Sequence, residues 1–383
     1  MSTKSPELPM KAHVEYPNLL SRLVLAESVD EQFPFPWRAR PKFETWFLRW
    51  YERHRLRVDT SHIAIDRPIF LVGLPRTGTT MLQDILCSHP QVAYLTNLMP
   101  SYPDCFCAAH VLCKRFHINF KADRFLGDSV EIELNSANEG LNILKGFEDD
   151  FYSLKYRELR VSDFAPELVE EWREGIKRVL WCFGGASRRF FNKNPEFTVH
   201  IRFLKELFPD AKIIYLIRDP RTCANSMVKL CQLIQAQEAK LRDKLRKGSG
   251  PTGAFVPYPR LPRLAEYVAL YGAADIRTTA NLWNDSVSFV DACASDCSFL
   301  TVRYEDVLAD SRGEIAKILD FCELPEADES VEPFWDKVRR IGMLRHSNRY
   351  GDFDLIEEIC RANMERYGYL DSGHSPDRVA AGV

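Results

Sequence analysis

The chain has 383 residues, of which 45% are hydrophobic and 27% charged, so it can bury a large core and is neither disordered nor collagen-like. Its 51 basic and 54 acidic residues give a net charge of −3, which leaves no global reason to expect nucleic acid or an anionic membrane as a partner. At about 150 residues per domain, this length fits two or three domains or one large α/β domain.

The N-terminal residues and the cysteines favour a cytoplasmic protein. Residues 1–16 are polar and lack the apolar segment of a secretory signal, and no run of 18 apolar residues predicts a membrane span. The eleven cysteines are spread along the chain, which is typical of reduced thiols in a cytosol. Three cysteines and His110 lie between residues 105 and 113. This group would allow a zinc site, but its apolar neighbours favour a buried helix, and we expect no metal.

The first 65 residues are patterned as helices. Four aromatic residues, Phe43, Trp46, Phe47 and Trp50, recur there at helical spacing. We interpret this stripe as core packing, with the wall of a ligand pocket as the alternative.

Short apolar segments alternate with helical patterns in the rest of the chain. This alternation predicts an α/β fold, a doubly wound and mostly parallel sheet with a helical N-terminal cap and helical insertions. We expect a single domain made of a cap (1–65), a core (66–322, with an insertion at about 100–185) and a C-terminal segment (323–383). The predicted strands cover residues 69–73, 189–193, 212–218 and 298–304, and the predicted helices cover about 81–86, 165–183, 199–208 and 221–239.

Residues 236–263 have the composition of a loop, with a basic run followed by three glycines and four prolines. We interpret this loop as a solvated excursion, with a lid over the substrate as the alternative.

A turn bracketed by Gly73 and Gly78 follows the first predicted strand and precedes a helix. This is the spacing of a P-loop, in which backbone N–H groups and the positive helix N-terminus meet a phosphate. Thr79 stands where nucleoside triphosphatases carry a lysine, so triphosphate hydrolysis is disfavoured, and Arg76 is the only cation of the turn.

Residues 75–80 resemble the 5′-phosphosulfate loop of the P-loop sulfotransferases that use 3′-phosphoadenosine 5′-phosphosulfate (PAPS). Arg218 ends a predicted strand and Ser226 follows eight residues later, as in the 3′-phosphate motif of that family. Residues 192–195 and 302–306 match two further family segments, and the branch that the chain resembles most is the bacterial and tyrosylprotein-like one. The resemblance implies a PAPS site formed by Arg76, Thr77, Gly78, Thr79, Thr80, Arg218, Ser226 and Tyr304.

Arg218 also fits a phosphate on physical grounds, because it lies at the carboxyl end of a strand, where α/β sheets bind ligands. The alternative is that Arg218 forms an ion pair with Asp219. Residues 345–353 resemble the basic loop that closes over the 3′-phosphate in the family. Arg345, Arg349 and Gly351 are therefore further candidates for cofactor binding.

Sulfuryl transfer is an in-line displacement, and we place Arg76 and Lys193 against the transferring group. One branch of the family has a glutamate base about twenty residues after the loop arginine, where this chain has Thr96 and Asn97. We therefore expect Glu139 to be the base, with His346 as the alternative.

The resemblance implies sulfotransfer from PAPS to a hydroxyl or amine of a small-molecule acceptor, with release of adenosine 3′,5′-bisphosphate. A P-loop kinase or other phosphotransferase, and a non-catalytic nucleotide-binding protein, are the alternatives. The aromatic residues that we expect to line an apolar acceptor pocket are Trp46, Tyr94, Tyr102, Phe106 and Phe147.

Overall fold

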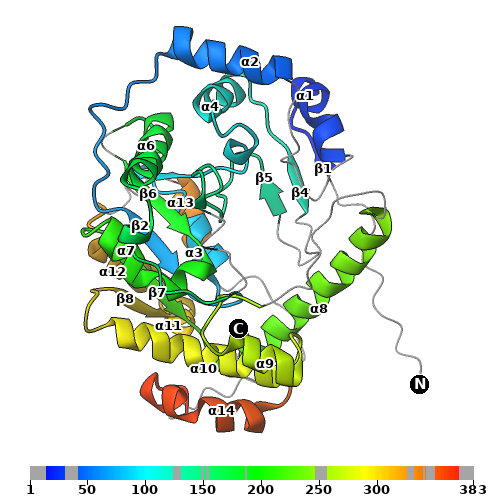
Figure 1. The fold of residues 1–383 in the computed structure, drawn as a ribbon, viewed down its shortest axis with the longest axis vertical. Helices are drawn as coiled ribbons and strands as arrows, with labels where there is room; N and C mark the ends of the chain where they lie inside the picture. Colours follow the sequence, from blue (N-terminus) through cyan, green and yellow to red (C-terminus); the bar gives the residue numbers. More distant parts are fainter. Residues whose placement is uncertain are drawn as a thin grey trace.

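The computed structural model describes residues 14–30, 42–123, 131–147, 151, 155–185, 188–245, 257–325, 332–339, 341 and 350–370. Its centre is a five-stranded sheet in the order β3-β6-β2-β7-β8, in which every neighbouring pair is parallel (Figure 1). The strands are β2 (Ile69–Val72), β3 (Val92–Tyr94), β6 (Arg189–Lys193), β7 (Lys212–Ile217) and β8 (Leu300–Arg303).

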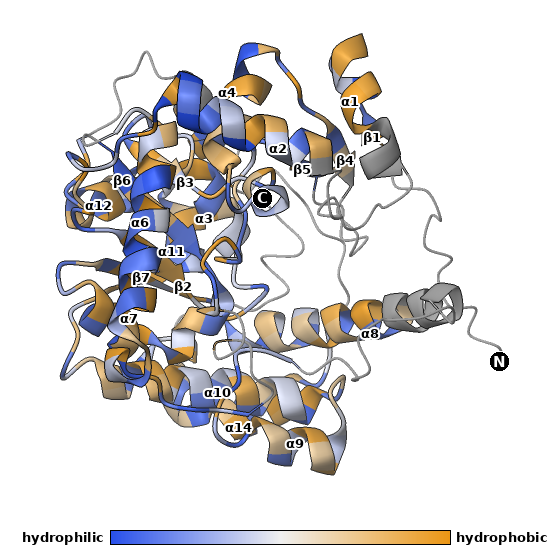
Figure 2. Ribbon diagram, turned by 45° about the horizontal axis from the view of Figure 1, so that its top comes forward, coloured by the Kyte–Doolittle hydropathy of each residue, from blue (hydrophilic) through white to orange (hydrophobic). Residues whose placement is uncertain are grey.

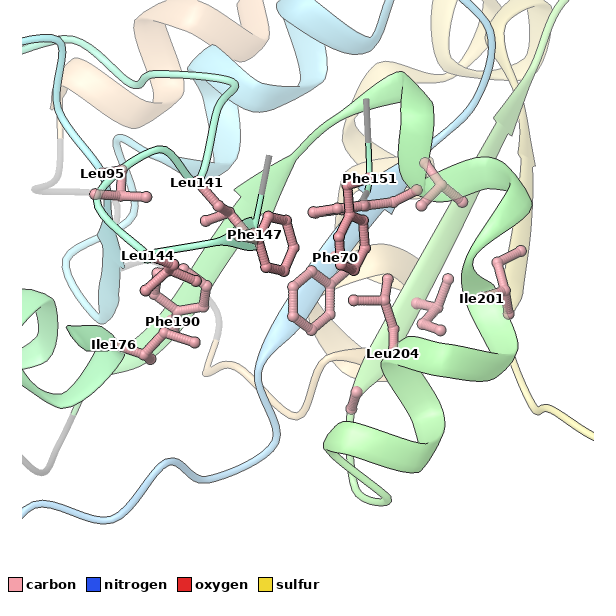
Figure 3. Packing of buried hydrophobic residues seen from close by; sticks show 14 of the residues in the cluster. Phe70, Leu95, Leu141, Leu144, Phe147, Phe151, Ile176, Phe190, Ile201 and Leu204 are labelled. Carbon is pink, nitrogen blue, oxygen red and sulfur yellow. The ribbon is translucent and has the colours of Figure 1, made fainter. Parts of the chain in front are cut away.

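The two faces of the sheet are buried in separate cores, as the alternation of side chains along a strand requires. In β2, Ile69 and Leu71 join a core formed with α3, α12 and α13, whereas Phe70 and Val72 join the larger core on the other face. Phe70 packs there against the ring of Phe190, with 6.3 Å between the ring centroids (Figure 3). The doubly wound α/β fold is therefore confirmed.

Helices cover both faces of the sheet, and four of them match the predicted helical segments. The helices from α6 onward are α6 (Pro166–Cys182), α7 (Ile201–Leu207), α8 (Pro220–Leu245), α9 (Leu264–Tyr271), α10 (Ile276–Cys293), α11 (Tyr304–Ala309), α12 (Ser311–Phe321), α13 (Glu332–Arg339) and α14 (Phe353–Arg366). The P-loop helix is α3 (Thr79–Leu86), and short 3₁₀ turns cover Met99–Ser101, Val161–Asp163 and Pro195–Val199. No helix within the described ranges is long and apolar enough to cross a membrane.

A second layer lies beyond the large core at one end of the molecule (Figure 1). It contains α1 (Leu19–Asp30), α2 (Lys42–Tyr51), a π-helical turn (Glu52–Leu56) and α4 (Phe106–Arg115). It also contains an antiparallel sheet in the order β1-β4-β5, formed by Val14–Glu15, Lys121–Asp123 and Glu131–Glu133. The predicted helical cap and insertion thus also contain short strands that the sequence did not reveal, because each of these strands has only two or three residues.

Two further predictions need correction. The aromatic stripe of α2 is not core, because Phe43, Trp46, Phe47 and Trp50 are 76%, 61%, 40% and 43% exposed, while Leu48 on the opposite side is buried. In addition, α8 continues to Leu245, so the first ten residues of the predicted loop 236–263 are helical. Residues 246–256 lie outside the described part of the chain.

Candidate active site

The P-loop joins β2 to α3, and its two glycines are required by close approaches of the backbone. Gly73 has φ +144°, and a Cβ there would lie 2.4 Å from the Leu216 carbonyl oxygen on β7. Gly78 has φ +98°, and a Cβ there would lie 2.5 Å from Cδ2 of Tyr304. Only glycine avoids both the strain and the clash, so the spacing seen in the sequence has a structural cause.

Gly78 precedes the first turn of α3, and among the described residues no side chain caps this helix end. The Thr77 hydroxyl turns away from the helix and donates to the Leu74 carbonyl oxygen at 2.7 Å. The N–H groups of the first turn have no intrahelical partner, and the helix dipole adds partial positive charge at the same place. Thr79 and Thr80 lie in this turn, so the loop has the donors that an anion needs.

The predicted 3′-phosphate residues lie against the loop. Arg76 Nε donates to Ser226 Oγ at 3.0 Å, and Arg218 Nη1 donates to the Arg76 carbonyl oxygen at 3.1 Å. The Arg218 guanidinium stacks 4.4 Å from the centre of the Tyr304 ring, which also covers Gly78. The P-loop, the ends of β7 and β8 and the start of α8 thus come together. They bring into one place four residues that the family resemblance assigned to the cofactor, namely Arg76, Arg218, Ser226 and Tyr304.

Asp219, the alternative partner of Arg218, forms its ion pair with Arg221 instead, at 2.6 Å. The carbonyl group of Arg218 accepts a hydrogen bond from Trp283 Nε1 at 2.9 Å, which fixes the strand end. The backbone N–H of Asp219 donates to Glu305 Oε1 at 3.0 Å, and burial raises the pKa of Glu305. The carbonyl end of β7 is therefore rigidly held.

Sequence reasoning missed two residues beside Ser226. Lys229 lies one helical turn further along α8, and burial together with the charge of Arg76 lowers its pKa. Asn225 binds the backbone of Gly351 twice, through Nδ2 to the carbonyl oxygen at 2.9 Å and through Oδ1 from the N–H at 3.3 Å. The i, i+3 spacing between Ser226 and Lys229 in a predicted helix is the sequence signal that could have identified Lys229.

The contact with Asn225 brings Gly351 next to the predicted phosphate serine, as its assignment to the cofactor loop requires. Arg345, His346 and Arg349, the other residues predicted in this segment, lie outside the described residues.

A second group forms at the carboxyl end of β6. Lys193 is almost fully buried, and its Nζ lies 2.5 Å from Glu139 Oε1 and 3.4 Å from Thr80 Oγ1. The Glu139 side chain is 36% exposed. The structure thus brings together the predicted catalytic lysine, the predicted base and a threonine of the P-loop helix.

Glu139 reaches Lys193 because its chain segment is held against the loop that follows β3. Asn138 N donates to the Leu95 carbonyl oxygen at 2.7 Å, and Asn138 Nδ2 donates to Asn97 Oδ1 at 2.9 Å. Asn97 Nδ2 in turn donates to Ser136 Oγ at 3.0 Å. Asn97, which with Thr96 stands where we expected the base of one branch of the family, therefore supports the segment that contains Glu139.

The aromatic residues predicted for an acceptor pocket have different environments. Tyr102, Phe106 and Phe147 are buried in the large core, and Trp46 is exposed on α2. Tyr94 ends β3 with its ring 4.9 Å from that of Phe183. Of the five, Tyr94 is the residue that the end of a parallel strand places toward the site.

The cysteine cluster belongs to α4. Cys105, Cys107 and Cys113 are buried, and the His110 ring lies 5.3 Å from Phe183. Burial, with a smaller contribution from Lys114, lowers the pKa of His110 to about 4. Within the described ranges, no three His, Cys, Asp or Glu side chains are grouped to hold a metal ion.

Comparisons with known proteins agree with this geometry. Residues 68–250 match the family model described as "Sulfotransferase family". The chain is 24% identical over 356 residues to the omega-hydroxy-beta-dihydromenaquinone-9 sulfotransferase Stf3 of Mycobacterium bovis, covering 85% of this chain and 81% of the relative. It is 21% identical over 324 residues to the protein-tyrosine sulfotransferase A of Caenorhabditis elegans, covering 83% of this chain and 61% of that protein.

The fold is shared with a solved structure, sulfotransferase STF9 from Mycobacterium avium, at a TM-score of 0.52 and 17% identity over 83% of this chain and 81% of that chain. The sequence matches span the P-loop and the segment containing Arg218 and Ser226, which favours sulfotransfer over the kinase and the non-catalytic alternatives. The sulfotransferase family model thus covers the P-loop core of the chain, and these matches support a PAPS-dependent sulfotransferase.

Proposed function

We propose that this enzyme transfers a sulfuryl group to the hydroxyl group of a small-molecule acceptor and that Glu139 accepts the hydroxyl proton. The observation that carries the proposal is the contact of Glu139 with Lys193 beside Thr80 of the P-loop helix. It joins a proton acceptor and a buried cation at the place where the family transfers the sulfuryl group.

In this proposal, some residues bind the cofactor and others stabilise the transferring group. Arg218, Ser226 and Gly351 hold the 3′-phosphate, and Tyr304 holds the adenine side, with Arg345 or Arg349 as further cofactor contacts. PAPS, when bound, supplies the sulfuryl group and an adenosine bisphosphate leaving group. Lys193 and Arg76 meet the negative charge that grows on the leaving oxygen, as preorganised donors do in other group transfers.

Lys193 and Arg76 are proposed to share the transferring group, while Lys193 also contacts Glu139 and Arg76 also contacts Ser226. Arginine and lysine supply the positive charge that a metal ion provides in phosphotransferases, so the proposal includes no metal.

A hydroxyl acceptor is preferred over an amine for a chemical reason. A neutral amine attacks with its lone pair and needs no base, whereas a hydroxyl must lose its proton as it attacks. The two sequence relatives are named for an omega-hydroxy compound and for protein tyrosine, both of which carry hydroxyl groups.

The exposure of the two partners supports the role of Glu139. Lys193 is 3% exposed and Glu139 is 36% exposed, so the carboxylate compensates the buried ammonium and also has a face toward an incoming acceptor.

The test is the Glu139→Gln variant, assayed for turnover of labelled PAPS against a panel of hydroxyl and amine acceptors. Loss of a general base costs about 10²–10⁴-fold in kcat and removes the acid limb of the pH profile. Affinity for adenosine 3′,5′-bisphosphate stays unchanged. Glu131→Gln, an exposed glutamate of β5 paired with Lys121, is the matched control.

Two further variants separate a base from a mere counter-ion. If Glu139 only compensates Lys193, Glu139→Gln keeps the shape of its pH profile and loses protein stability instead. Asn97→Glu in the Glu139→Gln background restores part of the rate if a carboxylate at the relatives' position suffices. If Glu139→Gln is fully active and His346→Asn is inactive, His346 is the general base.

A further inference from the structure

The exposed aromatic face of α2 has an unusual composition. Phe43, Trp46, Phe47 and Trp50 follow one another at i, i+3, i+4 and i+7, so they share one side of the helix. Their rings form a row, with centroid distances of 6.0 Å for Phe43 and Trp46 and 6.2 Å for Phe47 and Trp50. Monomers in water rarely expose a contiguous apolar row of this kind.

The row continues into basic residues. The Trp50 ring lies 5.8 Å from that of His54, which places His54 on the same side, at the π-helical turn. Arg53, Arg55 and Arg57 are exposed in the same turn and directly after it. The face therefore combines tryptophan and phenylalanine rings with a basic end.

The acidic residues of the same segment are used on its inner side. Glu44 accepts a hydrogen bond from the Tyr102 hydroxyl, and Glu52 accepts from Ala108 N at 2.9 Å and pairs with Arg178. Because Glu44 and Glu52 are bound on the inner side while Arg53, Arg55 and Arg57 are exposed, the turn 52–57 presents positive charge even though the whole chain has a net charge of −3.

Helix α1 adds a second apolar face at the same end (Figures 1 and 2). Its inner side is fixed by Ser21, whose hydroxyl donates to the His117 carbonyl oxygen at 3.1 Å and accepts from Asn119 N at 3.1 Å. The outer side is exposed, at 72% for Leu19 and 75% for Leu23. Both helices are thus fixed to the two ends of α4 with their apolar sides outward.

We propose that α1, α2 and the basic turn 52–57 form a docking surface for an anionic phospholipid bilayer. Tryptophan and phenylalanine rings beside arginines are typical of helices that lie in the plane of the membrane interface, and the outward positive charge matches anionic head groups. The surface would dock the protein without crossing the membrane.

The chain path links this surface to the acceptor side of the active site. The strand before α1 is β1, which pairs with β4, and β4 pairs with β5. The chain runs from β5 through the Asn97 network to Glu139. The segment that contains Glu139 therefore continues the layer that carries this surface, whatever the acceptor or the base proves to be.

The experiment is sedimentation of the full chain with vesicles of phosphatidylcholine alone or of equal parts phosphatidylcholine and phosphatidylglycerol. We expect sedimentation with the anionic vesicles only, and at least a tenfold loss of binding for Trp46→Ser/Phe47→Ser. Arg53→Gln/Arg55→Gln should weaken binding and reduce its dependence on salt. Leu270→Ser, an exposed leucine on α9, is the matched control and should bind as wild type does.

Folding of each variant is checked by the thermal shift that adenosine 3′,5′-bisphosphate produces, which does not involve this surface. Failure of the wild type to sediment with anionic vesicles would overturn the proposal, and so would equal binding by the aromatic double variant. A dimer of the wild type that becomes a monomer in Trp46→Ser/Phe47→Ser would instead assign the face to a second copy of the chain.

Discussion

The proposed cofactor end (the P-loop, Arg218 and Ser226) and the proposed acceptor side (Glu139, Lys193 and the Asn97 network) of this enzyme are built differently. At the cofactor end, the functional groups come from short motifs, with five consecutive residues in the P-loop and with Arg218 and Ser226 in one strand-to-helix unit. On the acceptor side, Glu139 contacts Lys193, which lies 54 residues away in the sequence, and Asn138 contacts Asn97, which lies 41 residues away. Local backbone geometry therefore forms the first region, whereas packing between distant segments forms the second. Substitutions in the two regions should affect different steps of the reaction.

Apart from Glu139→Gln, the largest effect is expected at Lys193, where the two regions meet. Lys193→Ala removes the buried cation beside Thr80, and loss of one donor to a developing charge costs about 10²–10³-fold in kcat. Binding of adenosine 3′,5′-bisphosphate, measured by calorimetry, should change little. Lys317→Ala, a surface lysine of α12 paired with Glu314, is the control. A collapse of nucleotide affinity at normal kcat would make Lys193 a binding residue.

Arg218 tests the cofactor end alone. Arg218→Ala removes a charged donor worth about 1.5–3 kcal/mol, so the Kd for adenosine 3′,5′-bisphosphate should rise roughly 10- to 100-fold. AMP, which lacks the 3′-phosphate, should bind the variant and the wild type alike. The two nucleotides are compared by titration calorimetry, with Arg277→Ala on α10 as the control. Equal losses for both nucleotides would contradict the assignment of Arg218 to the 3′-phosphate.

Asn138 tests the acceptor side alone. Asn138→Ala removes the bond to Asn97 and the bond that Asn138 Oδ1 accepts from Gly140 N at 2.8 Å. A loss of about 1–1.5 kcal/mol in positioning Glu139 corresponds to roughly a tenfold lower kcat. The acid limb of the pH profile should persist, because the carboxylate is still present. Asn281→Ala, on the surface of α10, should be neutral, and a shift in nucleotide affinity for Asn138→Ala would show that the two regions are not separate.

Two buried histidines allow the stability of the regions to be compared. Burial lowers the pKa of His110, on the acceptor side, and of His200, beside the central sheet, to about 4 from 6.5. The folded state thus favours the neutral rings, and stability is lost as pH falls from 6.5 toward 4, by at most about 3 kcal/mol for each histidine. Urea unfolding at several pH values measures this loss, and His200→Phe should flatten the curve. A curve without slope for the wild type would contradict these shifts.

The predictions made from the sequence succeeded where a pattern has one local cause. Gly73 and Gly78 bracket a turn whose close approaches exclude any side chain, and the strand containing Lys212–Ile217 is apolar at nearly every position. The predictions failed where the residues of a segment allow two structures. The aromatic stripe of α2 has the periodicity of a core helix. This periodicity indicates that one side of the helix is apolar, but it does not indicate whether other residues cover that side.

By itself, the sequence determined the parallel sheet, the P-loop and the presence of Arg218 and Ser226 in one strand-to-helix unit, because each depends on residues close together in the chain. Only the tertiary structure decided that Glu139 lies against Lys193, that Asn97 supports it, that Asp219 pairs with Arg221 and that the aromatic row of α2 faces outward. These contacts join segments or surfaces whose meeting depends on how the layers pack. That packing cannot be predicted from the spacing of residues along the chain.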